Sequence, residues 1–181
     1  MCIRDSPAVV LFRDLGPLPG KKLEKTLWHK GSRLARDPDG TPIRADEVTL
    51  GSVFHVIPEG LNKSAHPLEE KAKAAVLLVR IEPGLVQADP ARKGWDADGI
   101  YAYSKICTHV GCPVALYEQQ THHLLCPCHQ STFDLTQHCK VIFGPAKRPL
   151  PQLPITIDDD GYLVAQGDFP EPPGPSYWER S

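Results

Sequence analysis

Apolar residues recur along the chain in short stretches, and most of these stretches predict β-strands. Residues 48–57 alternate and are rich in side chains that favour extended backbone, which indicates a strand. Residues 75–81 form a continuous apolar run, which predicts a buried strand, and the Pro-Gly pair at residues 83–84 ends it. Residues 100–105 alternate again. We therefore expect several short strands and no long helix.

One short helix and two later hairpins complete the predicted elements. The helix is expected over residues 67–75, because proline suits a first helical position and Glu69 precedes Lys73 by four residues. Residues 117–125 predict a hairpin, and residues 153–165 predict another around an Asp-Asp-Asp-Gly turn. The 19 prolines also favour loops and short strands over helices. The predicted fold class is all-β, with stacked antiparallel sheets and one short helix.

The domain organisation follows from these elements. We predict an N-terminal arm or linker over residues 1–30, a folded domain over residues 31–168 and a proline-rich tail over residues 169–181. No apolar run, including residues 8–12, approaches the roughly 20 residues that span a bilayer. A net charge of −2 with scattered basic residues gives no sign of nucleic-acid binding.

Two short runs carry the chemistry of the chain, and each holds two cysteines and one histidine. They are residues 107–112 (Cys-Thr-His-Val-Gly-Cys) and residues 126–131 (Cys-Pro-Cys-His-Gln-Ser). One cysteine and one histidine from each loop is the ligand set of a Rieske [2Fe–2S] centre. The predicted iron ligands are Cys107 and Cys126 on one iron, and His109 and His129 on the other. Cys112 and Cys128 are then free to bridge the loops.

This ligand set suits an electron carrier. Replacing two thiolates by neutral imidazoles raises the reduction potential, to roughly −150 to +300 mV against about −400 mV for plant-type clusters. Histidine also carries a proton, so electron and proton transfer become coupled. Ser131 is placed to donate its hydroxyl to a cluster sulfur. Two alternatives remain: a tetrahedral zinc site, and disulfides with incidental histidines.

The two boxes resemble those of the Rieske iron–sulfur subunits of quinol–cytochrome c reductases, the cytochrome bc complexes. Both patterns, C-T-H-x-G-C and C-P-C-H-x-S, are complete, and residues 144–146 (Gly-Pro-Ala) match the proline loop that covers the cluster in this family. Residues 16–181 are similar to the actinobacterial branch, including a Gly-Pro-Ser-aromatic-Trp-Glu-Arg tail. The resemblance implies a Rieske domain whose cluster-binding part covers about residues 105–147.

Further expectations come from this resemblance alone. It implies one [2Fe–2S] cluster on the four predicted ligands, a disulfide between Cys112 and Cys128, and a cover formed by Gly144 and Pro145. His129 would accept a hydrogen bond from quinol and take up an electron and a proton together. The implied partners are cytochrome b, a dihaem c-type cytochrome and menaquinol, at the bacterial cell membrane with the domain on the extracytoplasmic side. The isolated domain would be an electron carrier, and catalysis would belong to the complex.

The chain departs from the family pattern at three points. Members of this branch have membrane helices before the domain, so we expect a membrane anchor to be missing from this sequence. Gln130 stands where the family often has glycine, and Phe133 stands where high-potential members carry a tyrosine that donates to a ligand sulfur. Two rival functions are a soluble Rieske ferredoxin, or related oxygenase domain, and the small subunit of an arsenite oxidase.

Overall fold

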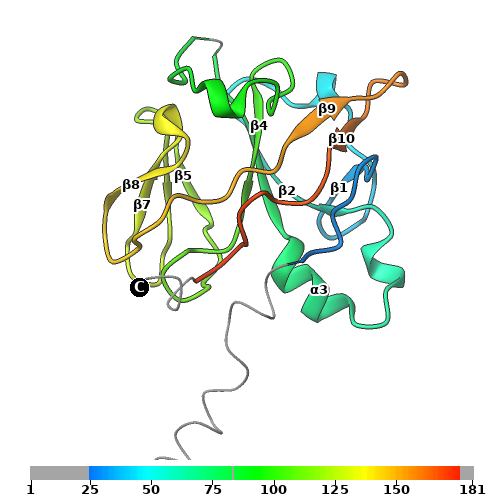
Figure 1. Cartoon of the computed structure of the whole chain (residues 1–181), viewed down its shortest axis with the longest axis horizontal. Coiled ribbons are helices and arrows are strands. Elements are labelled where there is room, and N and C mark those ends of the chain that lie inside the picture. The colour runs from blue at the N-terminus through cyan, green and yellow to red at the C-terminus, as the bar shows by residue number, and fades with distance from the viewer. Residues whose placement is uncertain (1–24, 83, 176–181) are drawn as a thin grey trace, which may run out of the picture.

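The computed structural model describes residues 25–82 and 84–175, and their strands form two separate four-stranded sheets and a hairpin (Figure 1). The first sheet is antiparallel in the order β1-β2-β3-β4. Its strands are β1 (Leu34–Arg36), β2 (Val53–Pro58), β3 (Val76–Arg80) and β4 (Ile100–Ser104). Strand β3 is buried through Val79, as its continuous apolar sequence predicts. We call this part, with the hairpin and helix below, the base.

The hairpin of β9 (Ile155–Ile157) and β10 (Leu163–Ala165) closes the base. Isolated bridges tie it to the first sheet, from Arg33 to Val164 and from Tyr103 to Gln152. The buried side chains between them include Leu34, Val56, Leu78, Ile155 and Leu163. A single hydrophobic core therefore holds the base together.

The second sheet carries the cluster-binding part and stands beside the base (Figure 1). Its antiparallel strands, in spatial order, are β5 (Leu116–Glu118), β6 (His123–Leu125), β7 (Thr132–Asp134) and β8 (Lys140–Phe143). A register shift interrupts the β7–β8 pairing at Thr132 and Phe133. A second hydrophobic core, to which Cys107 and Cys126 contribute, lies between this sheet and strands β3 and β4 of the first one. Two cores divide the molecule into two parts.

The described residues include one α-helix, α3 (Pro67–Ala74), with proline at its first turn. Lys73 approaches Glu69 at 3.4 Å, and the Trp28 indole donates to the Ala74 carbonyl at the end of the helix, at 2.8 Å. Within residues 25–82 and 84–175, four 3₁₀ turns lie between strands: η2 (Ala45–Glu47), η3 (Leu61–Lys63), η4 (Pro90–Arg92) and η5 (Leu135–Gln137). None of the helices in the described part of the chain is long and apolar enough to cross a membrane.

The structure confirms the all-β fold class, the short helix and both hairpins. The strand expected over residues 48–57 is wrong at its start, because Ser52 N–H donates to the Thr49 carbonyl and Gly51 has φ +73°, so a turn precedes β2. The pattern also missed β7 and β8. Most of the proposed arm, including residues 8–12, lies outside the described residues.

The C-terminal segment crosses from the base to the cluster-binding part as an irregular strap, residues 169–175 (Figure 1). It begins at the buried Phe169 and includes the buried Pro173 and Gly174. The division of the chain at residues 31 and 168 stays a prediction, but the strap packs on the folded part as far as the structure describes it.

Candidate metal centre

Two tight loops bring the predicted ligands together. The first loop follows β4 and is closed by the Cys107 N–H, which donates to the Cys112 carbonyl at 2.8 Å, and by the Gly111 N–H, which donates back to Cys107 at 3.0 Å. The second loop joins β6 to β7, and Cys126 N–H donates to the Ser131 carbonyl at 2.9 Å. Gln130, in place of the frequent glycine, takes φ +58° there. Backbone hydrogen bonds thus shape both loops.

The two cysteines predicted to hold one iron lie beside each other in the core. Cys107 and Cys126 are each 1% exposed, and their thiols interact. Burial is the main reason that the pKa of Cys107 rises to about 11, and the neighbouring Cys126 also raises it. The thiol therefore keeps its proton at neutral pH in the absence of metal. Because metal binding requires thiolates, a bound metal would displace these protons.

The two histidines also face each other. Their ring centroids are 4.7 Å apart with the planes at 88°. Nδ1 of His109 is buried and has no hydrogen-bond partner in the described structure, whereas His129 is exposed. A buried unpaired nitrogen is costly unless something occupies it, and a metal ion would do so. The donor set of two thiols and two imidazoles therefore fits a [2Fe–2S] cluster.

Ser131 connects the second loop to the proline loop and to Cys107. Its side chain is fully buried, its Oγ accepts a hydrogen bond from Ala146 N–H at 3.1 Å, and its hydroxyl hydrogen-bonds the Cys107 sulfur. Gly144 lies against the same residue: a Cβ at Gly144 would stand 2.5 Å from the Ser131 Cα, and its φ is +91°. Only glycine allows this approach. Pro145 follows and is exposed.

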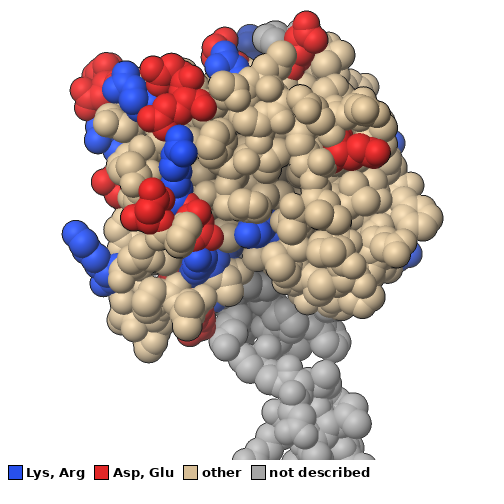
Figure 2. Space-filling model, turned by 180° about the vertical axis from the view of Figure 1, so that it is seen from behind, with Lys and Arg blue, Asp and Glu red and all other residues tan. Residues whose placement is uncertain are grey.

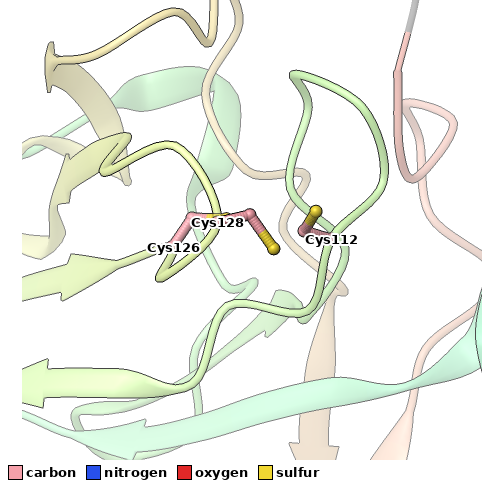
Figure 3. Close-up of side chains that lie close together, drawn as sticks. All are labelled: Cys112, Cys126 and Cys128. Atoms are coloured by element: carbon pink, nitrogen blue, oxygen red, sulfur yellow. The ribbon is translucent and has the colours of Figure 1, made fainter.

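The remaining cysteine of each loop completes a group of three thiols (Figure 3). The sulfur atoms of Cys112, Cys126 and Cys128 lie within 4.8 Å of one another, and the Cys128 side chain points toward Cys112. Both thiols of the predicted disulfide are free here and interact with each other. This group contains the predicted iron ligand Cys126 and both cysteines of the predicted disulfide. Its geometry therefore does not tell which of the three sulfurs bind iron and which form a disulfide. The pairing of Cys112 with Cys128 stays a prediction.

One further set of contacts at this site could not be predicted from the sequence. Thr108, between two predicted ligands, donates its hydroxyl to the Arg148 carbonyl at 2.6 Å, and the Arg148 side chain donates to the strap. These partners lie 40 and 24 to 26 residues apart in sequence, so no local pattern announces them. Two other histidines have ordinary partners: His122 lies 3.3 Å from the Tyr117 hydroxyl, and His123 lies 4.0 Å from Glu118.

The fold and the paired loops define a Rieske-type iron–sulfur protein, and the comparisons with known proteins agree. Residues 72–154 match the family model described as Rieske [2Fe-2S] domain. The chain belongs to the Rieske iron–sulfur subunits of the cytochrome bc1 complex, as the relatives described below establish. It accordingly carries one [2Fe–2S] cluster, and neither a soluble ferredoxin nor an arsenite oxidase subunit is favoured.

Three relatives, all named cytochrome bc1 complex Rieske iron-sulfur subunit, are actinobacterial. The Streptomyces coelicolor protein is 57% identical over 173 residues, which is 95% of this chain and 49% of the relative. The Streptomyces lividans protein is 56% identical over 170 residues, 93% of this chain and 99% of the relative. The Mycobacterium tuberculosis protein is 45% identical over 166 residues, 83% of this chain and 39% of the relative. The chain thus spans about half or less of two of these relatives.

Proposed function

We propose that this chain is the electron carrier of a respiratory quinol–cytochrome c reductase. It takes one electron from menaquinol, with coupled proton transfer at His129, and passes it to a dihaem c-type cytochrome. Cytochrome b is the partner that presents the quinol. The observation that carries the proposal is the asymmetry of the two histidines: His109 is partly buried with an unpaired nitrogen, and His129 is exposed beside it.

The proposed ligands are Cys107 and Cys126 on the inner iron, and His109 and His129 on the outer one. When bound, the cluster supplies a one-electron couple. The chain supplies the rest: two buried cysteines exclude water on one side, and the Ser131 hydroxyl hydrogen-bonds the Cys107 sulfur. The outer nitrogen of the exposed His129 is free to accept a hydrogen bond from a quinol hydroxyl and to hold its proton.

The surface around the exposed histidine supports docking on another protein. Val110 and Phe143, in the first loop and at the end of β8, are 45% and 63% exposed. On the face shown in Figure 2, charged side chains crowd over the base and are sparse over the cluster-binding part. A weakly charged, partly apolar tip suits an apolar partner surface. We propose that this tip meets cytochrome b in a membrane-associated complex, on its extracytoplasmic side.

The proposed compartment rests on the cysteines. A disulfide persists in an oxidising environment, and the Cys112 and Cys128 sulfurs already lie within 4.8 Å of each other. Alkylation of the unreduced and the reduced chain, followed by mass spectrometry, tests the pairing. We expect Cys112 and Cys128 to resist alkylation until reduction. Cys139, fully buried and outside both cluster loops, should give the same result before and after reduction in unfolded samples. Alkylation of both Cys112 and Cys128 before reduction would contradict the disulfide.

The proposed function is tested by a redox titration of the purified chain at several pH values, followed by EPR and visible circular dichroism. Histidine ligation predicts a one-electron potential between about −150 and +300 mV that falls as the pH rises through the pKa of a ligand imidazole. A pH-independent potential near −400 mV would contradict histidine ligation. A colourless, redox-silent protein containing zinc would overturn the proposed function.

A further inference from the structure

Arg148 joins segments that lie far apart in the sequence. Its carbonyl accepts the Thr108 hydroxyl at 2.6 Å, and Thr108 lies in the first loop, between Cys107 and His109. Its guanidinium donates to the carbonyls of Pro172 and Gly174 in the strap, both at 2.8 Å. Arg148, which follows the proline loop in sequence, thus connects to the first cluster loop through its carbonyl and to the C-terminal strap through its side chain.

The strap itself lies close to the first cluster loop. Pro173 and Gly174 are buried, and a Cβ built on Gly111 would meet Pro175 Cδ at 3.6 Å. Glu171 adds an ion pair with Arg148 at 3.5 Å, where the arginine side chain is 17% exposed. The strap belongs to no strand of the described structure, so the two donated hydrogen bonds are important for holding it. Both carbonyls accept from one nitrogen of the guanidinium, Nη2, while Nη1 faces Glu171, so the end of this side chain meets the strap at three points.

We propose that Arg148 is a positioning residue for the cluster, acting as a clamp between the strap and the first cluster loop. The inference rests on the proposed ligand assignment, because Thr108 matters only if its neighbours bind iron. The clamp holds the Arg148 backbone where its carbonyl can accept the Thr108 hydroxyl. It also steadies Ala146, two residues earlier, whose N–H donates to Ser131 at 3.1 Å.

Loss of the hydrogen bonds between Arg148 and the strap would therefore disturb both cluster loops. Thr108 would lose a fixed acceptor, and the hydrogen bond from Ser131 to the Cys107 sulfur would weaken as the proline loop moves. Hydrogen bonds to the sulfurs and solvent exposure are among the factors that set the potential of an iron–sulfur cluster. A donor to a ligand sulfur favours the reduced, more negative state, so weakening it lowers the potential.

The first test replaces the guanidinium in the full 181-residue chain. For Arg148→Gln we expect cluster loss in chelator to be at least fivefold faster. We also expect the oxidised-to-reduced ratio at a fixed potential to rise about threefold, which is about 28 mV for a one-electron couple. Arg148→Met keeps the apolar stem and removes every donor, so it should behave like the glutamine variant. A normal potential in Arg148→Met would show that the two hydrogen bonds to the strap do not act on the cluster and would overturn the clamp.

The second test removes the other half of the clamp. A chain that ends at Pro170 lacks both acceptor carbonyls, and a chain that ends at Pro175 keeps them as the matched control. The shorter chain should reproduce the effect of Arg148→Gln, and adding that substitution to it should change the potential no further. Additive shifts would mean that the arginine and the strap act separately, which contradicts the proposal.

A charge control separates local from general effects. Arg33 forms a comparable ion pair with Asp158 at 2.9 Å in the base, and Arg33→Gln should leave the potential and the EPR spectrum unchanged. If Arg148→Gln lowers only the melting temperature and leaves the potential, spectrum and cluster loss unchanged, Arg148 is merely structural and the proposal fails. A wild-type chain without a Rieske signal would overturn the proposed function, and this inference with it.

Discussion

Phe133→Tyr should raise the midpoint potential of the cluster. Phe133 lies on β7, where it pairs with Leu124 and Val141, and its side chain is completely buried. It packs in the same hydrophobic core as Cys107 and Cys126, the proposed ligands of the inner iron. A tyrosine here would bring a hydroxyl group into the core that contains those sulfurs, and the phenylalanine ring has no such donor.

The size of the effect follows from the strength of one hydrogen bond. A hydrogen bond to a charged group contributes about 1.5 kcal/mol at the lower end of its usual range. Only the part of this energy that differs between the oxidised and reduced states changes the potential, so a hydrogen bond of this strength raises it by at most about 60 mV for a one-electron couple. The expected increase lies between zero and this bound. A hydroxyl that fails to reach a sulfur would instead stay unpaired and destabilise the fold by about 1–3 kcal/mol.

The assay is an EPR-monitored redox titration of the wild-type and variant chains at one pH. Phe169→Tyr is the matched control, because Phe169 is 8% exposed and packs in the core of the base instead. It should leave the potential unchanged. Phe133→Leu removes the ring without adding a donor and should not raise the potential. A folded Phe133→Tyr chain whose potential is unchanged or lower would refute the reasoning.

Three further predictions concern the loops and the adjoining turn. Ser131→Ala should lower the potential by up to about 60 mV in the same titration, because the Cys107 sulfur loses its donor. Gly144→Ala should lower the cluster content and the melting temperature much more than the control Gly94→Ala does. Both glycines have positive φ, but of the two only Gly144 has backbone atoms within 3 Å of an added Cβ. Gly94→Ala should lower the free energy of unfolding by about 1–2 kcal/mol. Burial favours a higher pKa for Asp134, but hydrogen bonds from Thr136 and Gln137 outweigh it and lower the pKa. The ionised carboxylate therefore stabilises the fold at neutral pH, and this stabilisation is lost as the pH falls through the lowered pKa. Asp134→Asn should therefore flatten the acid side of the stability profile measured by denaturant unfolding, and an unchanged profile would contradict the assignment.

The sequence predicted those parts of the fold whose signals are local. Helix α3 begins at a proline and carries a favourable charge pair, and β3 is a continuous apolar run, so both were placed within a residue of their observed bounds. Strand β8 was missed because three of its four residues are exposed, and it shows no buried face in the sequence. Strand β7 follows the second cluster loop directly, and the cysteine and histidine pattern obscured it.

The same difference between local and long-range signals applies to the candidate site. The structure places Cys107 beside Cys126 and His109 beside His129, and the assignment of these four residues as iron ligands stays a prediction. The contact of Ser131 with Cys107 was expected only in general terms, because the acceptor lies 24 residues earlier in the sequence. The link from Thr108 to Arg148 depends on how the strap packs, and a backbone carbonyl as acceptor places no demand on residue type.

The two hydrophobic cores differ in their relation to the proposed redox centre. The base core contains none of the proposed ligands, whereas Cys107 and Cys126 are part of the second core. The sulfur side of the site is therefore packed by side chains of both sheets, and the histidine side opens to solvent through His129. Electron transfer needs one buried and stable side and one accessible side. This division of the site supplies both, because the buried ligands are fixed by core packing and the exposed one by loop hydrogen bonds.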